Sequence, residues 1–320
     1  MELRQLRTFV HVAELGSFSA AAERLHIAQP ALSRQIQILE QELGVNLFRR
    51  HGRGAVLTEQ GQLFLSRATL VLRELERARE ELRGDEAILS GQVSFGMPPT
   101  VADVLSTPLI EHFSAAHPQV KLRVASGYSG HVLDWLQRGM VDIAVLYETR
   151  QQPRTIRTQP LILEQLFLIA PGNEDRSPIT FADSLKRNLI LPSKHHGLRI
   201  VLENFAARES LTIDPVIEVD SLPVQIDLAR RNIGCIVLPL VSVFAAVEAG
   251  QLSAHPIVAP EVTRRMLIAT ASNRPMSAAV RRFAGAIRSQ VTHLAQSGRW
   301  PGVLLSEDAA DDDEAPPAAQ

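Results

Sequence analysis

Residues 19–40 read Ser19-Ala-Ala-Ala-Glu-Arg-Leu-His-Ile-Ala-Gln-Pro-Ala-Leu-Ser-Arg-Gln-Ile-Gln-Ile-Leu-Glu40, a pattern that predicts two short helices joined by a tight turn. Ser19 is a good N-cap for the first helix, which we expect to end near residues 26–27. Pro30 suits the first position of the second helix. An apolar stripe then recurs at intervals of four, three and four residues, made by Leu32, Ile36, Leu39 and Leu43. This is the layout of a helix-turn-helix motif.

The face of the second helix opposite that stripe is polar, with Pro30, Ser33, Arg34 and Gln37. Hydroxyl, guanidinium and amide groups on an exposed helix are suited to base edges and phosphates in a major groove. An amphipathic helix can also be simply solvated, and helix-turn-helix geometry occurs in proteins that never contact DNA. The motif alone therefore leaves both interpretations open.

The segments that flank the motif favour DNA binding. Before it, a third helix is predicted from an inward stripe of Leu6, Phe9, Val10 and Ala13. After it, residues 48–57 resemble a short hairpin, with Arg53 between two glycines at the tip, where it could enter a minor groove. Arg49 and Arg50 lie beside it and complete the basic cluster of the N-terminal third.

Three stretches of sequence resemble the LysR-type transcriptional regulators: residues 1–9, residues 28–35 and Leu47-Phe-Arg-Arg50. Residues 89–93 and 142–145 are similar to the branch that includes nitrogen-assimilation regulators. The resemblance implies a winged helix-turn-helix that binds promoter DNA, a long dimerising helix and a two-lobed domain that senses a small effector. It also implies recognition-helix contacts by Gln29, Pro30, Ser33 and Arg34, with Arg53 in the wing. Gln37, Arg49 and Arg50 complete the predicted DNA-binding set.

Composition limits the other classes of protein. A chain of 320 residues suggests two or three folding units. The net charge is −2, and the first sixty residues hold seven arginines against six glutamates, so DNA binding rests on the placement of charge. The single cysteine, Cys235, excludes an intramolecular disulfide and fits a reducing compartment. No run approaches 18 apolar residues and no leader pattern is present, which predicts a cytoplasmic protein without a membrane segment.

Residues 58–86 are rich in Leu, Arg, Glu and Ala, contain no proline and predict a long helix. Its apolar positions alternate by four and three, as in a coiled coil. The predicted dimerisation residues are Phe64, Ala68, Val71, Leu75, Ala78 and Leu82. A single helix with such a seam needs a partner, and we expect a second copy of the chain, forming a dimer or tetramer. The alternative is that the seam packs on the protein's own next domain.

From about residue 90 the pattern changes to alternating strands and helices, which predicts an α/β domain with a mostly parallel sheet. The strands are predicted at residues 93–96, 121–125, 142–146, 166–170, 189–191, 216–219, 235–238 and 265–269. The family resemblance implies two lobes of periplasmic-binding-protein type, with the chain crossing between them near residues 147–163 and 260–267.

The predicted domain organisation follows from these patterns. A winged helix-turn-helix occupies residues 1–58, a linker helix residues 59–89 and the effector domain residues 90–302. Within the effector domain, lobe I is expected at about 90–162 and 267–300, and lobe II at about 163–266. The acidic tail 303–320 is expected to be disordered, because its composition cannot bury enough apolar surface to fold.

A ligand site is predicted where strands of the α/β domain end and helices begin. Residues 96–100, 126–130 and 193–197 have that position, and residues 220–221 follow a further strand. The predicted effector-binding residues are Pro99, Thr100, Ser126, Gly127, Ser129, His196 and Ser221. Ser, Thr and Gly at helix starts are also ordinary caps, and that interpretation stands beside the functional one.

Catalytic motifs give no support for an enzyme. Residues 127–131 lie where a nucleophile elbow would, but His131 replaces the last glycine of that motif. No dinucleotide or Walker phosphate loop occurs, and His195 and His196 lack the spacing of a metal site, so no catalytic residue, metal or cofactor is predicted. A hydrolase would need a nucleophile and a base that are not apparent.

The favoured function is therefore a sequence-specific transcriptional regulator that binds double-stranded promoter DNA and a small effector, with RNA polymerase as a further candidate partner. The alternative is a cytoplasmic ligand-binding protein whose N-terminal domain binds protein partners. That alternative predicts no salt-sensitive DNA affinity.

Overall fold

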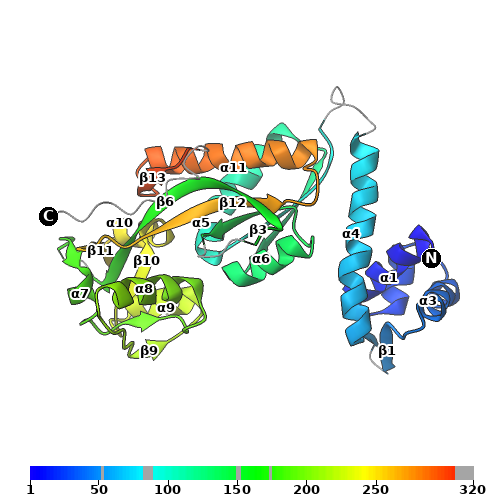
Figure 1. Cartoon of the computed structure of the whole chain (residues 1–320), viewed down its shortest axis with the longest axis horizontal. Helices are drawn as coiled ribbons and strands as arrows, with labels where there is room; N and C mark the ends of the chain where they lie inside the picture. Colours follow the sequence, from blue (N-terminus) through cyan, green and yellow to red (C-terminus); the bar gives the residue numbers. More distant parts are fainter. Residues whose placement is uncertain (52–53, 82–88, 149–152, 173–174, 307–320) are drawn as a thin grey trace. The chain divides into compact units, whose positions relative to one another are not determined.

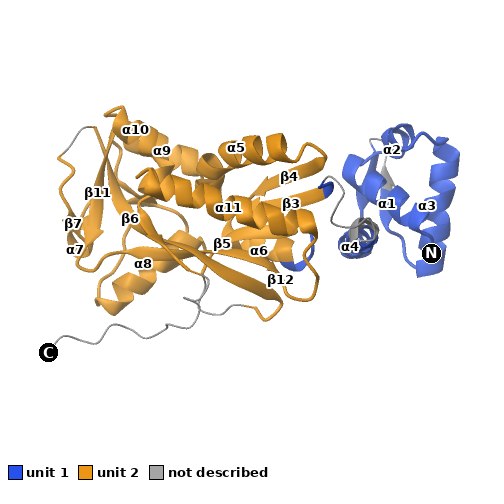
Figure 2. Ribbon diagram, turned by 90° about the horizontal axis from the view of Figure 1, so that it is seen from above, with its two compact units in different colours: residues 1–91, 137–140 blue, residues 92–136, 141–320 orange. Residues whose placement is uncertain are grey.

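A computed structural model describes residues 1–51, 54–81, 89–148, 153–172 and 175–306. The chain divides into two compact units, coloured separately in Figure 2. The first unit comprises residues 1–91 together with residues 137–140. The second unit comprises residues 92–136 and 141–320. Each unit has its own apolar core, so each is described by itself.

The N-terminal unit confirms the predicted helix-turn-helix and hairpin. Its elements are α1 (Leu3–Leu15), α2 (Phe18–Arg24), α3 (Gln29–Leu43), β1 (Phe48–His51), β2 (Gly54–Leu57) and α4 (Glu59–Glu81). The stripe predicted on α3 is the buried one, because Leu32, Ile36 and Leu39 have no exposed surface. The N-cap prediction was wrong: Ser17, and not Ser19, caps α2 by accepting from the Ala20 amide.

The linker helix α4 covers residues 59–81 of the predicted 58–86, but its first turns belong to the core of this unit. The ring of Phe64 lies 5.0 Å from that of Phe9 on α1, and Ala68 is 1% exposed. Gly61 lets the helix approach the wing, since a Cβ there would lie 2.1 Å from the Leu47 carbonyl oxygen. Ala68 therefore belongs to the core of this unit and Phe64 is partly buried against α1, whereas the dimer seam itself stays a prediction.

The second unit is built on one sheet with the strand order β4-β3-β5-β12-β6-β11-β7. These strands are β3 (Gly91–Met97), β4 (Val120–Ser126), β5 (Ile143–Tyr147), β6 (Ile156–Pro171), β7 (Ile179–Thr180), β11 (Leu252–Val258) and β12 (Thr263–Ala271). Two more, β10 (Ile236–Pro239) and β13 (Gly302–Leu304), pair with β6. The separate pair β8 (Ile190–Leu191) and β9 (Ile217–Glu218) is parallel.

The expectation of a mostly parallel sheet was wrong, because the sheet is mixed. The β3–β5 pair is parallel, but β12 runs antiparallel to both β5 and β6, and β6 runs antiparallel to β10 and β11. Residues 156–165, which precede the predicted strand 166–170 and overlap the expected crossing at 147–163, extend β6 into a strand of 16 residues that pairs with β12 (Figure 1). The two chain crossings therefore lie side by side in one antiparallel ladder.

Helices cover this sheet and complete its core. They are α5 (Pro99–Ala116), α6 (Ser129–Gln137), α7 (Phe181–Ser184), α8 (Gly197–Arg208), α9 (Leu222–Arg230), the 3₁₀ turn η1 (Leu240–Ser242), α10 (Phe244–Glu248) and α11 (Ala278–Gln296). Phe283 of α11 makes edge contacts with Phe95 and Phe113, at 5.3 and 4.9 Å between ring centroids. Cys235, at the start of the strand predicted over residues 235–238, is buried beside β10.

The prediction that the disordered tail starts at residue 303 was also wrong. Residues 302–304 form β13 on β6, and the Leu305 amide donates to the Leu161 carbonyl oxygen over 3.1 Å. Pairing with an existing strand supplies the backbone partners that the composition of the tail does not suggest. Residues 307–320 lie outside the described part of the chain.

Candidate functional site

The outer face of α3 presents the polar residues singled out in the sequence. Gln29, Pro30, Arg34 and Gln37 are exposed, and Ser33 is half-buried. Gln29 Nε2 donates to Ser33 Oγ over 3.2 Å, so the two side chains form one polar edge near the helix start. Hydrogen-bonding groups therefore line the N-terminal half of α3, the part of a recognition helix that contacts base edges.

Packing holds α3 rigidly behind that face. The side chains of Thr8 on α1 and Gln35 on α3 hydrogen-bond at 2.6 Å, and Thr8 is 1% exposed. At the other end of the helix, Glu40 Oε1 accepts from the amides of Leu47 and Phe48, which fixes the start of the hairpin. A binding surface on such a scaffold keeps its side chains in one geometry.

The hairpin is anchored to the end of α1. The Ala55 amide donates to the Gly16 carbonyl oxygen over 2.8 Å, and a Cβ on Gly54 would lie 2.5 Å from that oxygen. Arg49 on β1 is exposed. The Arg50 side chain and Arg53 lie outside the described residues, so their predicted roles stay predictions.

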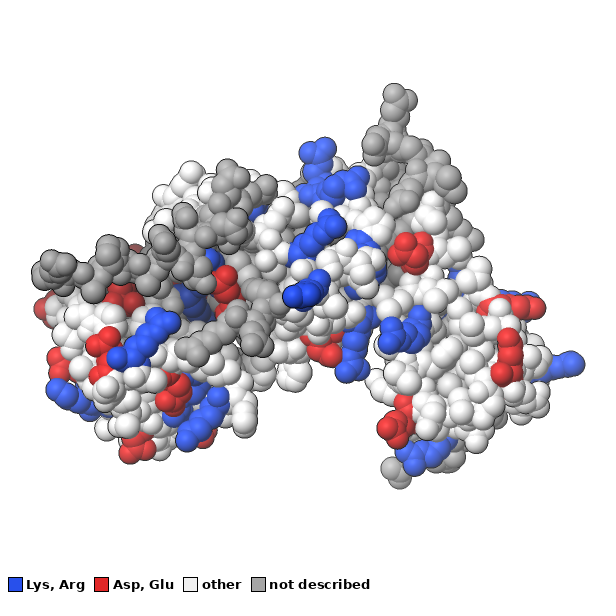
Figure 3. All heavy atoms as spheres, viewed as in Figure 1, with Lys and Arg blue, Asp and Glu red and all other residues white. Residues whose placement is uncertain are grey.

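Among the described residues, neither Arg34 nor Arg49 forms an ion pair. Both guanidinium groups are therefore available to phosphate oxygens or base edges. Acidic and basic side chains are interspersed over the face shown in Figure 3, in agreement with the net charge of −2. The positions of these arginines, and not the overall charge, mark the surface.

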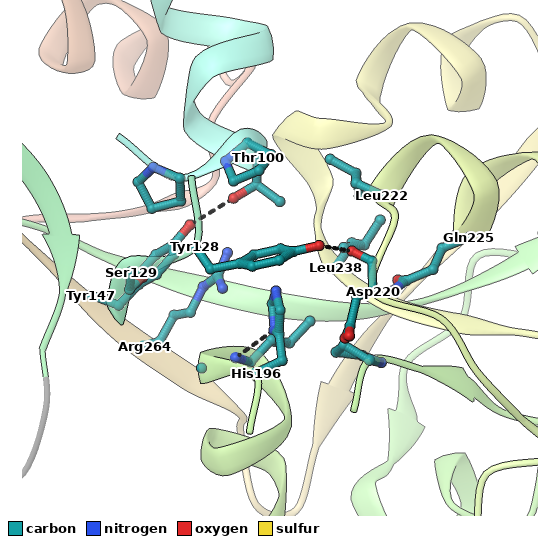
Figure 4. Close-up of a pocket in the computed structure, with 15 residues that line it drawn as sticks. Thr100, Tyr128, Ser129, Tyr147, His196, Asp220, Leu222, Gln225, Leu238 and Arg264 are labelled. Atoms are coloured by element: carbon teal, nitrogen blue, oxygen red, sulfur yellow. Dashed lines mark hydrogen bonds between the residues drawn. The ribbon is translucent and has the colours of Figure 1, made fainter. Parts of the chain in front are cut away.

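A cavity lies in the second unit where several strands end (Figure 4). Its lining includes four of the predicted effector residues: Pro99, Thr100, Ser129 and His196. The other three predicted residues are not part of the lining. Ser126 and Ser221 are exposed, and Gly127 has a packing role, because a Cβ there would lie 2.6 Å from the Trp135 ring.

Residues that the sequence prediction missed make up much of the wall: Pro98, Tyr128, Tyr147, Pro192, Gly197, Leu198, Asp220, Leu222, Gln225, Leu238 and Arg264. Tyr128 and Asp220 lie in the segments 126–130 and 220–221, which the sequence predicts to border the site. Nothing in the local sequence marks Arg264, which reaches the cavity only because β12 passes beside β5 and β6.

Tyr128 spans the cavity. Its hydroxyl donates to the Asp220 carbonyl oxygen, and its ring makes an edge contact with His196 at 4.8 Å between centroids (Figure 4). The Asp220 carboxylate accepts from the amide and the hydroxyl of Ser193, over 2.9 and 3.1 Å. The segment after β4 is thus hydrogen-bonded to the segment after β9.

A cluster of charged and aromatic groups forms the opposite wall. Thr100 Oγ1 and Tyr147 Oη lie 2.9 Å apart, and the Arg264 guanidinium carbon lies 3.6 Å from the centre of the Tyr147 ring. Behind them Glu164, with no exposed surface, accepts from Arg264 Nε and from Trp300 Nε1. Burial raises the pKa of Tyr147, so its hydroxyl stays protonated and able to donate.

His196 is the N-cap of α8, where its Nδ1 accepts from the Leu198 amide over 3.2 Å. Burial lowers the pKa of His196, the nearby Arg264 lowers it further, and Asp220 acts in the opposite direction. The ring is therefore held in its neutral form. With Nδ1 accepting, the ring proton lies on Nε2.

Within the residues that the structure describes, no group of three His, Cys, Asp or Glu side chains is arranged to hold a metal ion. The same residues contain no helix that is long and apolar enough to span a membrane.

Comparison with known families adds the decisive observation. Residues 3–62 match the bacterial regulatory helix-turn-helix proteins of the LysR family, and residues 87–292 match the LysR substrate binding domain. The chain belongs to the LysR family. It is a transcriptional regulator with an N-terminal DNA-binding domain and an effector-binding domain, as the sequence predicted.

Curated relatives of this LysR-type regulator include transcriptional regulators of similar length. BbuR from Bordetella bronchiseptica is 29% identical over 300 residues, which cover 93% of this chain and 92% of the relative. The nitrogen assimilation regulatory protein Nac from Klebsiella aerogenes is 34% identical over 241 residues, covering 75% and 78%. The second match agrees with the predicted branch of the LysR family.

Solved structures of LysR-type regulators share the fold. A full-length OxyR from Pseudomonas aeruginosa, solved as a cysteine-to-aspartate variant, gives a TM-score of 0.70 at 25% identity, covering 91% of this chain and 94% of that one. Full-length CbnR, solved in complex with its target DNA, gives a TM-score of 0.66 at 24% identity, with coverages of 91% and 100%.

Proposed function

We propose that this LysR-type regulator places α3 in a major groove of promoter DNA, with Arg34 and Gln37 at base edges and Arg49 on the phosphate backbone. The observation that carries the proposal is the exposed face of α3, on which Arg34 has no ion-pair partner among the described residues. CbnR, a relative in fold, was solved in complex with its target DNA, which supports DNA binding by this fold. Gln29, Pro30 and Ser33 are assigned to the same surface, and Arg50 and Arg53 to the wing.

Dimerisation is assigned to the part of α4 that the first unit leaves uncovered. Val71 is 48% exposed, Ala78 is exposed and Leu75 is half-buried, whereas Phe64 and Ala68 face the core. A second copy on this face would present two recognition helices to two half-sites. Leu82 lies outside the described residues.

We assign the effector to the cavity of the second unit, with Pro99, Thr100, Ser129 and His196 in contact with it. The cavity combines apolar walls with a few convergent polar groups, as small-molecule sites commonly do. An effector that fits one arrangement of the unit better than another shifts the population of arrangements. The boundaries of the two lobes remain predictions, and Ser126, Gly127 and Ser221 are no longer favoured as contacts.

The remaining assignments follow from the role of a regulator. Acting on promoters places the protein in the cytoplasm, beside the chromosome and RNA polymerase. We assign it no catalytic activity, because the polar groups of the cavity hold one another and include no nucleophile with an adjacent base.

The experiment that tests DNA binding is fluorescence anisotropy with the DNA immediately upstream of the protein's own gene. The titration is repeated across a salt series with random-sequence competitor. Specific binding whose log affinity falls linearly with log salt is expected, because phosphate contacts release counterions. Equal affinity for promoter and random DNA would instead favour an N-terminal domain that binds protein partners.

Arg34→Ala and Arg123→Ala are the matched variants for this titration. Both remove one exposed arginine, but Arg123 lies on β4 of the second unit. Promoter affinity is expected to fall only for Arg34→Ala. An equal loss in both variants would show that the effect comes from net charge and would contradict the assignment to α3.

A further inference from the structure

The cavity wall contains one buried cationic donor whose hydrogen bonding is incomplete. Arg264 is 6% exposed, and its Nε donates to Glu164. Its Nη2 is buried and has no hydrogen-bond partner among the described residues. An unmet buried donor costs about 1–3 kcal/mol, and more when the group is charged, so such groups in native proteins usually have a partner that binds there.

The surroundings of Arg264 indicate which chemical group that partner carries. A guanidinium recognises a carboxylate strongly, because both are planar and the hydrogen bond is charge-assisted. The hydroxyls of Thr100 and Tyr147 lie on the same side of the cavity and are hydrogen-bonded to each other, so the pair supplies at most one further donor (Figure 4).

The charged groups on the two walls of the cavity determine the orientation of a bound acid. The Asp220 carboxylate lies on the opposite wall, where Ser193 holds both of its oxygens. Repulsion from Asp220 turns an anionic group towards the other end of the cavity, where Glu164 balances the charge of Arg264 and the buried Nη2 offers a charge-assisted donor. Between the two ends, Pro98, Leu222 and Leu238 offer apolar surface for the body of a small molecule.

We propose that the effector of this regulator is a small organic acid whose carboxylate binds Arg264, Thr100 and Tyr147. The inference rests on the proposed effector role of the cavity and adds the chemical class of the ligand. A neutral carbonyl compound would offer an acceptor but no charge, so the proposal requires that an acid bind better than its own amide.

Trp300, which is hydrogen-bonded to Glu164 behind Arg264, provides a fluorescence signal for binding at this site. Glu164 accepts from Arg264 through one oxygen and from Trp300 Nε1 through the other, over 2.8 Å in the second case. A carboxylate bound at Arg264 Nη2 places a second negative charge beside the Glu164 carboxylate and thereby changes the hydrogen bond from Glu164 to the indole. The chain has two tryptophans, so Trp135→Phe leaves Trp300 as the single reporter.

The test is a titration of full-length Trp135→Phe protein with butanoate and benzoate against butanamide and benzamide, at constant ionic strength, followed by tryptophan emission. The proposal expects saturable changes with the acids and an affinity for each acid at least about tenfold above that for its amide. The thermal unfolding midpoint of the unaltered chain, measured with the same compounds, repeats the comparison without any substitution.

The double variant Glu164→Gln/Arg264→Gln tests whether Arg264 binds the carboxylate of the ligand. It removes both charges together, so that no buried charge is left alone, and the amide that replaces the Glu164 carboxylate keeps an acceptor for Trp300. The acid-to-amide preference is expected to fall to about one in this variant. A preference that survives the double substitution would overturn the assignment of Arg264.

Two further outcomes separate this inference from the proposed function. If acids and amides bind equally well, or if neither acid shifts emission or the unfolding midpoint at millimolar concentration, the proposal of an acid effector is wrong. Promoter affinity is measured on the same preparations. Failure of the wild-type chain to bind promoter DNA is a separate result, which contradicts the DNA-binding proposal and not the ligand class.

Discussion

The two binding surfaces of this protein are built from the chain in opposite ways. The outer face of α3 comes from one short stretch, residues 29–37, whose polar side chains point to solvent. The cavity wall draws on segments spread between Pro98 and Arg264, and its buried cation, Arg264, is hydrogen-bonded to Glu164 behind it. Substitutions on α3 should therefore change binding with little effect on stability, whereas substitutions in the cavity wall should change both.

The largest expected effect belongs to the cavity wall. Arg264→Ala leaves Glu164 buried without its cationic partner and is expected to cost about 3–5 kcal/mol of unfolding free energy. Urea unfolding followed by tryptophan emission measures this. Arg265→Ala is the neighbouring control, because that guanidinium is 30% exposed and lies 3.6 Å from Glu148, where about 0–1 kcal/mol is expected. Equal losses of unfolding free energy in the two variants would contradict the expected difference between the buried Arg264 and the partly exposed Arg265.

The linker helix offers a second test, since the first turns of its apolar stripe pack in the N-terminal unit and the later turns of the same stripe are exposed. Phe64→Ala removes a ring packed on Phe9 and should cost about 2 kcal/mol or more in the N-terminal unit. Val71→Ala, in the exposed later turns of the helix, should leave that unit stable and raise the dimer dissociation constant. Circular dichroism and sedimentation velocity separate the outcomes. A dimer weakened equally by both variants, without loss of stability, would restore Phe64 to the seam.

On the α3 surface we expect the opposite result, a loss of promoter affinity with little loss of unfolding free energy. Arg34→Ala is expected to lower promoter affinity by about 1–3 kcal/mol, the usual range for one base contact. Its unfolding free energy should stay within about 0.5 kcal/mol of wild type, because the side chain is exposed. Anisotropy and urea unfolding on the same preparation give both numbers. A large loss of stability would mean that α3 binding and folding cannot be separated.

The smallest effect concerns pH. The pKa of His196 is lowered in the folded protein, so the folded state binds fewer protons than the unfolded state as pH falls. The contribution to stability is complete above the ordinary histidine range and is lost on acidification. His196→Asn keeps an N-cap acceptor and should flatten the decline in stability between about pH 7.5 and about pH 5.5.

His195→Asn is the control for that measurement, because it removes an exposed imidazole outside the cavity lining. Urea unfolding at several pH values compares the variants with wild type. If the His196→Asn curve declines as steeply as that of wild type, the cavity histidine does not contribute in the assigned direction.

The sequence predicted the N-terminal unit well, because its signals are local. Helix periodicity, the α3 stripe and the hairpin glycines act within a few residues of one another, and the structure confirms the elements they indicate. The errors had local causes too. Ser17 and Ser19 are both good caps, and a heptad-like seam does not show whether α1 or a second chain will cover it.

In the second unit the sequence by itself determined the alternation of strands and helices and the cap-rich segments, four of whose predicted residues line the cavity. Only the tertiary structure decided that β6 and β12 run antiparallel through one sheet and that β13 joins β6. It also decided that Arg264 and Glu164, a hundred residues apart, meet behind the cavity. Local sequence specifies a strand and its faces, but pairing between strands depends on contacts between distant segments, which no short pattern encodes.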